Sequence, residues 1–196
     1  EVQKHECGFF GFNDLLIEAS KAYEIGALPG FVEVLVDEYQ DTNNVQHKLI
    51  ESLRARSLFC VGDYDQSIYG FNGANIEIIA AFEKERKEAR VYTLTKNYRS
   101  TSKILQLADK VIRHNDRIYP KRLEVVRDGY AHSPRILVFD EVFLQYKTVA
   151  HMIEQSTTPR AEIAVLFRNN SSADGIEASL REFGISCKRK GGVSFF

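Results

Sequence analysis

The sequence predicts an α/β protein in which the strands run parallel. Short apolar runs alternate along the chain with segments whose apolar residues recur at helical spacing, and this alternation is typical of parallel sheets joined by helices. The runs at 31–36 and 58–61 are nearly continuous in apolar residues, as in strands that are buried on both faces. Each of these two runs ends in a polar loop that contains acidic residues. Since ligands bind at the carboxyl ends of parallel strands, we expect a functional site there.

The first part of the chain contains three expected helices and two expected strands. Glycine and proline at 26–30 end the first helix, and Asn43 with Gln46 forms a capping box at the start of the second. In chain order we expect a helix within 9–23, a strand at 31–36, a helix with its stripe at 45–53, a strand at 58–61, and a helix that runs from 76 into the charged segment 83–90.

A domain boundary is expected at the end of that charged segment. We therefore expect one domain at 1–89, the C-terminal part of a first domain, and another at 90–196, the N-terminal part of a second. The second part should contain strands at 91–94, 136–139 and 163–167. Three helices are expected in it: one at 102–113, one with its apolar stripe at 142–153, and one that ends at Gly184. In the first of these, residues 104, 105, 108, 111 and 112 should face inward. The segment 115–133 is expected to be irregular.

Composition excludes several classes of function. The net charge of −1 over 196 residues gives no overall signature of nucleic-acid binding, so a DNA site would have to be a local patch. No His/Cys set has the spacing of a zinc site. The three isolated cysteines are expected to be reduced, buried thiols of a cytoplasmic protein. No signal peptide or long apolar span occurs, so neither export nor membrane insertion is expected.

Residues 34–42, Val-Leu-Val-Asp-Glu-Tyr-Gln-Asp-Thr, carry the main chemical signal. Asp37 and Glu38 stand side by side at the end of a strand, where carboxylates can hold hydrated Mg²⁺ and polarise a water molecule. The simpler interpretation is an acidic turn that leads to a helix capped by Asn43. From the two acids alone, both interpretations are about equally good.

Residues 62–74 carry the second signal, Gly-Asp-Tyr-Asp-Gln-Ser-Ile-Tyr-Gly-Phe-Asn-Gly-Ala, after the strand at 58–61. Gln66 could reach a terminal phosphate or the attacking water. Tyr69 and Phe71 alternate with small residues, which suits a stacking platform for bases. The alternative is a glycine-rich turn whose aromatic rings return to the core.

Residues 94–101 carry the third signal, Leu-Thr-Lys-Asn-Tyr-Arg-Ser-Thr. Arg99 follows the first expected strand of the second part and could neutralise charge that builds on a transferred phosphoryl group. Taken by itself, an arginine that holds together the loop before a helix is the better interpretation.

Together the three signals resemble the UvrD/Rep/PcrA family of superfamily 1 DNA helicases. Residues 36–42 resemble the Walker B element (motif II), residues 62–74 resemble motif III and residues 97–100 resemble motif IV. Segments 164–169 and 191–196 resemble later blocks of the second motor domain. The resemblance covers nearly the whole chain and implies parts of two RecA-like (P-loop NTPase) domains.

The resemblance also implies roles at a nucleotide site that uses ATP and Mg²⁺. Asp37 would bind Mg²⁺, and Glu38 would orient and deprotonate the hydrolytic water. Gln66 would sense the γ-phosphate and link it to DNA. Tyr98 would stack on adenine, and Arg99 would reach across from the second domain.

A DNA site is implied at Tyr69, Phe71 and Asn72. The family more often has Trp where Phe71 stands and Arg where Asn72 stands. Phenylalanine still stacks, with less area. Asn72 lacks the cation, so we expect a hydrogen bond to DNA from it rather than a phosphate contact.

The chain is expected to be an internal fragment of a longer motor. It begins at Glu1, ends in an apolar run and contains no Gly-x-x-x-x-Gly-Lys-[Ser/Thr] loop. Alone it should neither hydrolyse ATP nor unwind DNA. Its parent resembles an ATP-dependent, 3′-to-5′ helicase or translocase that acts on single-stranded DNA and duplex junctions. The motor part of a helicase-nuclease and a non-catalytic DNA-binding or interaction module are the alternatives.

Overall fold

The computed structural model describes residues 8, 10–127 and 132–190, and these form two compact units. The first unit is Glu1–Pro134 and the second is Arg135–Phe196. Both contain helices, and the first contains two pairs of parallel strands, as the predicted α/β class requires. The expected domain boundary between residues 89 and 90 stays a prediction.

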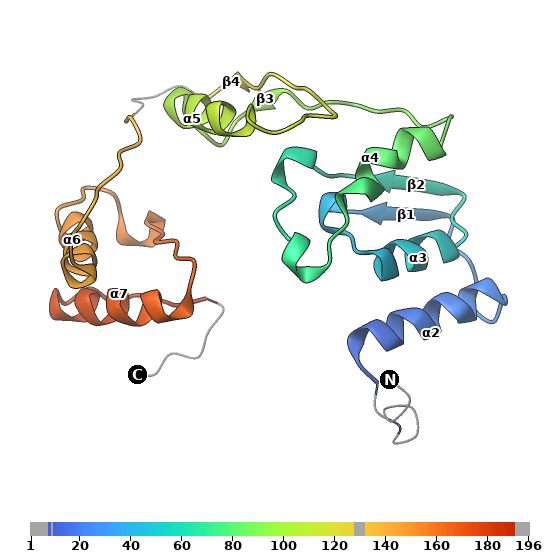
Figure 1. The fold of residues 1–196 in the computed structure, drawn as a ribbon, viewed down its shortest axis with the longest axis horizontal. Coiled ribbons are helices and arrows are strands. Elements are labelled where there is room, and N and C mark those ends of the chain that lie inside the picture. Colours follow the sequence, from blue (N-terminus) through green and yellow to red (C-terminus); the bar gives the residue numbers. More distant parts are fainter. Residues whose placement is uncertain (1–7, 9, 128–131, 191–196) are drawn as a thin grey trace. The chain divides into compact units, whose positions relative to one another are not determined.

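The first sheet consists of β1 (Glu33–Val36) and β2 (Ser57–Cys60), which lie side by side in Figure 1. They are parallel, and their register pairs Glu33 with Ser57 and Val36 with Cys60. Both strands were expected, but burial on both faces was wrong. Leu35 is 70% exposed and Phe59 is 56% exposed, because one face of this two-stranded sheet is open to solvent.

Three helices accompany this sheet, namely α2 (Phe12–Glu24), α3 (Asn44–Ser52) and α4 (Ile76–Glu85). α2 packs against α3 (Figure 1). The predicted capping box is confirmed: the Asn43 side chain accepts from the Gln46 amide, and the Gln46 side chain accepts from the Asn43 amide, both at 2.9 Å. α4 starts at Ile76 and ends at Glu85, inside the charged segment 83–90 into which it was expected to run.

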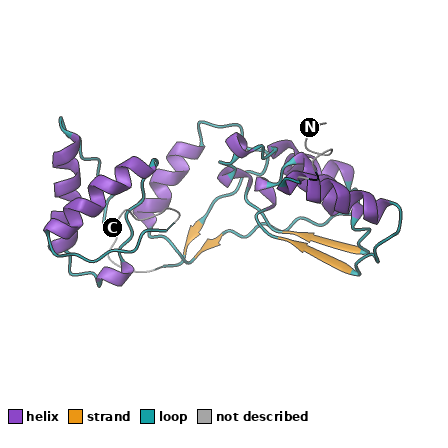
Figure 2. Cartoon of the chain, turned by 90° about the horizontal axis from the view of Figure 1, so that it is seen from below, coloured by secondary structure: helices purple, strands orange, loops and turns teal. Residues whose placement is uncertain are grey.

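The second sheet consists of β3 (Lys96–Asn97) and β4 (Glu124–Val125), and Figure 2 shows the two strand pairs as orange arrows. The expected strand at 91–94 is absent, and β4 lies in the segment expected to be irregular. The position of a strand depends on its hydrogen bonds to a neighbouring strand. Here the Glu124 amide donates to the Thr95 carbonyl at 2.8 Å, and the Val126 amide donates to the Asn97 carbonyl at 3.0 Å.

α5 (Ser102–Ile112) follows β3 and confirms the expected helix. Its apolar stripe is not buried as expected, since Ile104 and Val111 are both exposed. An apolar stripe predicts which face of a helix can be buried, but whether that face is buried depends on tertiary packing against other elements.

The described residues of the second unit contain two α-helices, α6 (Val142–Glu154) and α7 (Asn170–Glu182), which pack against each other (Figure 1). A short 3₁₀ helix, Arg160–Glu162, lies between them in the sequence. Its core consists of Ala150, Leu180 and Ile185. Gly184 ends α7 as expected, with φ at +65°. The expected strands at 136–139 and 163–167 do not form, because strands need a hydrogen-bonded partner that an apolar run alone does not supply.

The cysteines only partly match the expectation of buried thiols. Cys60 is half-buried and free, and burial raises the pKa of its thiol to about 11. Cys187 is free but exposed, contrary to expectation. Cys7 lies outside the described residues, as does the block 191–196. No helix in the described part of the chain is long and apolar enough to span a membrane.

Candidate nucleotide and DNA site

The loops that follow β1 and β2 meet at one edge of the first sheet. The Val61 amide donates to the Val36 carbonyl at 2.8 Å, and the Tyr39 amide donates to the Val61 carbonyl at 2.9 Å. These bonds extend the parallel ladder past the ends of both strands. The two acid-bearing loops therefore lie next to each other, at the carboxyl ends of the strands where a functional site is expected.

The backbone at Glu38 has an uncommon conformation. Glu38 has φ 49° and ψ 42°, the left-handed region that costs a non-glycine residue about 1 kcal/mol or more. Arg54 is the other described non-glycine residue with positive φ. Asp37 and Glu38 are both exposed, and an Asp37 carboxylate oxygen accepts from the Glu38 amide at 2.9 Å. Strain of this kind is often found at functional sites, so it is consistent with a special role for Glu38.

Gln40, a residue for which the sequence predicts no role, joins the two loops. Its side chain donates to Glu38 Oε2 at 2.8 Å and to Asp41 Oδ2 at 3.3 Å, while its own Oε1 accepts from the Asp63 amide at 2.9 Å. The residue is only 2% exposed. One sequence feature could have indicated this role: Gln40 is a neutral side chain with both a hydrogen-bond donor and an acceptor, and it lies within a run of acidic residues.

Gly62 allows this close approach. A Cβ at Gly62 would lie 2.9 Å from Gln40 Oε1 and 3.1 Å from Ile79 Cδ1. Any other residue at this position would have to displace one of these neighbours. The glycine therefore sets the distance between the loops.

Gln66 is exposed and is held by Asp63. Its Nε2 donates to Asp63 Oδ2 at 2.7 Å. Lys121 forms a hydrogen-bonded ion pair with Asp63 Oδ1. Burial alone would raise the pKa of Asp63, but the bonds from Lys121, Gln66 and the Asp65 amide outweigh it and hold that pKa below its ordinary value.

The second acid of this loop also has a basic partner. Asp65 pairs with Arg117 at 2.7 Å, and Lys121 lies 3.8 Å from the same carboxylate oxygen. Asp63, Asp65, Arg117 and Lys121 thus form a four-residue ion-pair cluster. Both basic residues lie in a segment expected to be irregular, because no local pattern links them to acids more than 50 positions earlier.

The predicted DNA-binding residues lie on the surface of the loop after β2. Tyr69 is 44% exposed and Phe71 is 81% exposed, and their ring centroids are 5.9 Å apart. Asn72 is also exposed, in a short 3₁₀ turn at Gly70–Asn72. This exposure suits base stacking, and the role of the three residues stays a prediction.

Tyr98 and Arg99 follow β3 and are both exposed. Their loop is ordered by Asn97, whose side-chain oxygen accepts from the Arg99 amide at 3.1 Å, and by Arg127, which donates to the Arg99 carbonyl at 2.8 Å. Across residues 8, 10–127 and 132–190, no hydrogen bond or ion pair joins Tyr98 or Arg99 to the acids after β1. Their role at a nucleotide site stays a prediction.

The residue types after β1 suit Mg²⁺ bound together with a nucleotide. Among the described residues, no three His, Cys, Asp or Glu side chains are grouped closely enough to hold a metal by themselves. Mg²⁺ in nucleotide sites typically uses one or two protein carboxylates, with water and phosphate oxygens completing the shell. The exposed Asp37 carboxylate fits that requirement.

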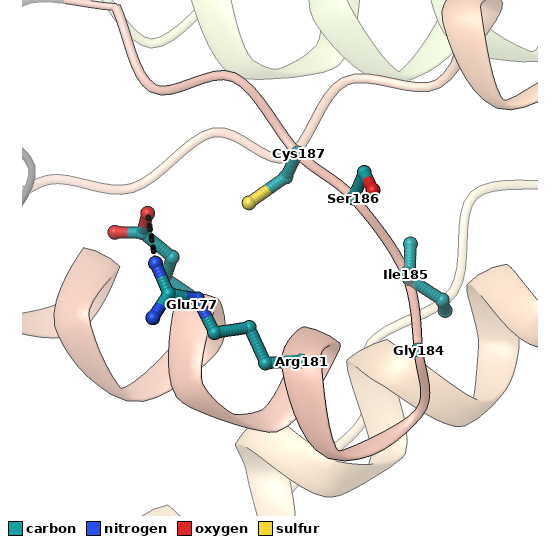
Figure 3. Close-up of a pocket in the computed structure, with 6 residues that line it drawn as sticks. All are labelled: Glu177, Arg181, Gly184, Ile185, Ser186 and Cys187. Atoms are coloured by element: carbon teal, nitrogen blue, oxygen red, sulfur yellow. Dashed lines mark ion pairs between the residues drawn. The ribbon is translucent and has the colours of Figure 1, made fainter. Parts of the chain in front are cut away.

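A separate cavity of about 380 Å³ lies in the second unit (Figure 3). It is bordered by the end of α7, where Glu177 and Arg181 form an ion pair at 3.7 Å, and by the segment that follows this helix. None of the predicted site residues lines it.

Two family models together match most of the chain. Residues 1–87 match the UvrD/REP helicase N-terminal domain, and residues 92–196 match the UvrD-like helicase C-terminal domain. The ATP-dependent DNA helicase PcrA of Bacillus subtilis is 37% identical to this chain over 204 residues, covering 94% of the chain and 26% of PcrA.

Other relatives are similar to the same extent. PcrA of Leuconostoc citreum is 37% identical, covering 82% of this chain and 22% of its own length. The ATP-dependent DNA helicase UvrD1 of Mycobacterium tuberculosis is 37% identical, covering 85% of this chain and 23% of its own length. The chain therefore spans about a quarter of the length of these curated relatives.

Proposed function

This chain belongs to the UvrD-like helicase family, and on that premise we propose that it forms part of an ATP-dependent DNA helicase or translocase. The observation that carries the proposal is the junction of the loops after β1 and β2. The Gln40 side chain forms hydrogen bonds with both the Glu38 carboxylate and the Asp63 amide. As a result Asp37, Glu38 and Gln66 follow two paired strands at a single sheet edge, where α/β proteins bind their ligands.

Each residue at this edge has a part in the proposed ATP hydrolysis. Asp37 would hold Mg²⁺, which when bound neutralises charge on the phosphates. Glu38 orients the hydrolytic water and takes its proton, and its carboxylate is itself oriented by Gln40. Gln66 contacts the terminal phosphate from the loop after β2. Its exposed amide nitrogen can make this contact with its second N–H while the first stays bonded to Asp63.

The proposed motor also needs contributions from a second domain. We propose that residues 1–89 and 90–196 belong to two successive RecA-like domains. Tyr98 would stack on the adenine of ATP, and Arg99 would stabilise the transferred phosphoryl group. The exposed positions of both side chains after β3 support this assignment.

DNA is the proposed polymer substrate. The exposed rings of Tyr69 and Phe71 offer faces on which bases can stack, and Asn72 can donate or accept a hydrogen bond beside them. Cycles of ATP binding and hydrolysis would move this surface along single-stranded DNA. The 3′-to-5′ direction follows from the family resemblance.

The test uses the full-length protein that contains this chain, because the chain has no phosphate-binding Gly-x-x-x-x-Gly-Lys-[Ser/Thr] loop of its own. Glu38→Gln should lower kcat for DNA-stimulated ATP hydrolysis by about 100-fold or more and leave ATP binding largely intact. Glu33→Gln, at an exposed residue on β1 just before the loop, is the matched control. ATP hydrolysis that is absent from the wild type, or unchanged in Glu38→Gln, would refute the proposal.

A further inference from the structure

The four-residue ion-pair cluster beside Gln66 is more buried than ordinary surface ion pairs. Its side chains are 12–24% exposed. Its two carboxylates are paired with two cations, one of which, Arg117, also lies 3.8 Å from Asp109. Partly buried pairs of this kind are costly to break one partner at a time, because the remaining charge is left without compensation. The cluster therefore imposes a definite arrangement on the groups bonded to it.

The Asp63 carboxylate links the cluster to Gln66. One oxygen, Oδ1, accepts from Lys121, and the other, Oδ2, accepts from Gln66 Nε2 at 2.7 Å. Lys121 therefore fixes the plane of the carboxylate to which the Gln66 amide is bonded. Asp63 Oδ1 also accepts from the Asp65 amide at 3.0 Å, which leaves the carboxylate little freedom to turn.

The segment that carries Lys121 is anchored independently. Arg117 Nη2 donates both to Asp65 and to the Lys121 carbonyl, at 2.7 and 3.2 Å. Between them, the Tyr119 hydroxyl donates to the Ile79 carbonyl at 3.3 Å. Lys121 is thereby positioned by backbone and side-chain contacts that do not involve Gln66.

We propose that Lys121 is a positioning residue for Gln66, acting through Asp63, with Arg117 holding the backbone that presents Lys121. The inference rests on the proposed role of Gln66 at the terminal phosphate. Gln66 lies in the part of the chain that matches the N-terminal helicase domain, and Lys121 lies in the part that matches the C-terminal domain. The position of Gln66, in the part that matches the N-terminal domain, thus depends on the charge of Lys121, in the part that matches the C-terminal domain.

The experiment measures DNA-stimulated ATP hydrolysis of the full-length protein in Lys121→Met, which has a similar length but no charge. We expect kcat to fall roughly 10- to 100-fold, as for other small misplacements of reacting groups, with KM for ATP nearly unchanged. Lys121→Arg should restore most of kcat because it can again pair with Asp63. Lys110→Met, which removes an exposed lysine on α5, should behave as the wild type.

The decisive arm repeats Lys121→Met in a Gln66→Ala background. If Lys121 acts through Gln66, Lys121→Met should lower kcat by less than twofold in a protein that already carries Gln66→Ala. An equal further loss in both backgrounds, or a wild-type kcat in Lys121→Met, overturns the proposal.

Lys121→Gln, which keeps a hydrogen-bond donor, replaces Lys121→Met if the methionine variant does not fold. A several-fold loss of kcat that disappears in the Gln66→Ala background supports the proposal, and wild-type kcat overturns it. A wild-type protein without DNA-stimulated ATP hydrolysis would instead refute the proposed function, so the two failures are distinguishable.

Discussion

Replacing Gly62 with alanine tests whether the two loops depend on their close approach. The added Cβ would lie 2.9 Å from Gln40 Oε1, 3.1 Å from Ile79 Cδ1 and 3.2 Å from the Gln40 amide nitrogen. The side-chain oxygen is held by the Asp63 amide, and the amide nitrogen belongs to the backbone, so neither can move away freely. Overpacking of this kind costs about 1–3 kcal/mol in free energy of unfolding.

Gly70→Ala is the matched control, because a Cβ at Gly70 has no neighbour within 4 Å. There the loss of unfolded-state freedom should stabilise the protein by about 0.4–1 kcal/mol. Urea unfolding of both variants, followed by circular dichroism, gives the two changes. If Gly62→Ala were as stable as Gly70→Ala, the loops would not be held at the distance described, and the role assigned to Gln40 would lose its basis.

Three further predictions concern Gln40, Asp63 and Cys60. Gln40→Leu should lower the free energy of unfolding by about 1–3 kcal/mol, because it leaves the Asp63 amide without its partner; urea unfolding measures this, and an unchanged midpoint would contradict the bridging role. The lowered pKa of Asp63 means that its folded carboxyl binds a proton less readily than the unfolded one, whose ordinary pKa is 3.8. The stability advantage of wild type over Asp63→Asn should therefore be fully present above that pH and shrink as the pH falls through the folded pKa; thermal unfolding between pH 2.5 and 6, roughly the range over which carboxyl groups titrate, would detect it, and a pH-independent difference would count against it. Burial raises the pKa of Cys60 to about 11, so its alkylation by iodoacetamide should be slow at neutral pH, and the alkylation rate should rise with pH up to about 11. Peptide mass spectrometry measures this rate, and a rate that levels off at about pH 8.5, the pKa of an ordinary thiol, would contradict the prediction.

Features that depend on neighbouring residues in the sequence were predicted well. The capping box at Asn43 and Gln46 specifies the start of α3 because both hydrogen bonds close within four residues. β1 and β2, and the acid-bearing loops after them, follow from apolar runs that end at polar residues. The exposed position of Asp37 and Glu38 at the sheet edge follows in turn from the parallel pairing of these strands.

Features that depend on distant partners were decided by the tertiary structure. The apolar runs at 136–139 and 163–167 predict extended chain, but a strand also requires a neighbour for its ladder bonds, so neither forms one. The pairing of β3 with β4 was missed for the same reason. The roles of Gln40 and Lys121 arise from single hydrogen bonds across 23 and 58 positions of the chain. Sequence determined which side chains stand at the ends of the strands, and folding alone decided which distant groups hold them there, because a hydrogen bond depends on separation in space and not along the chain.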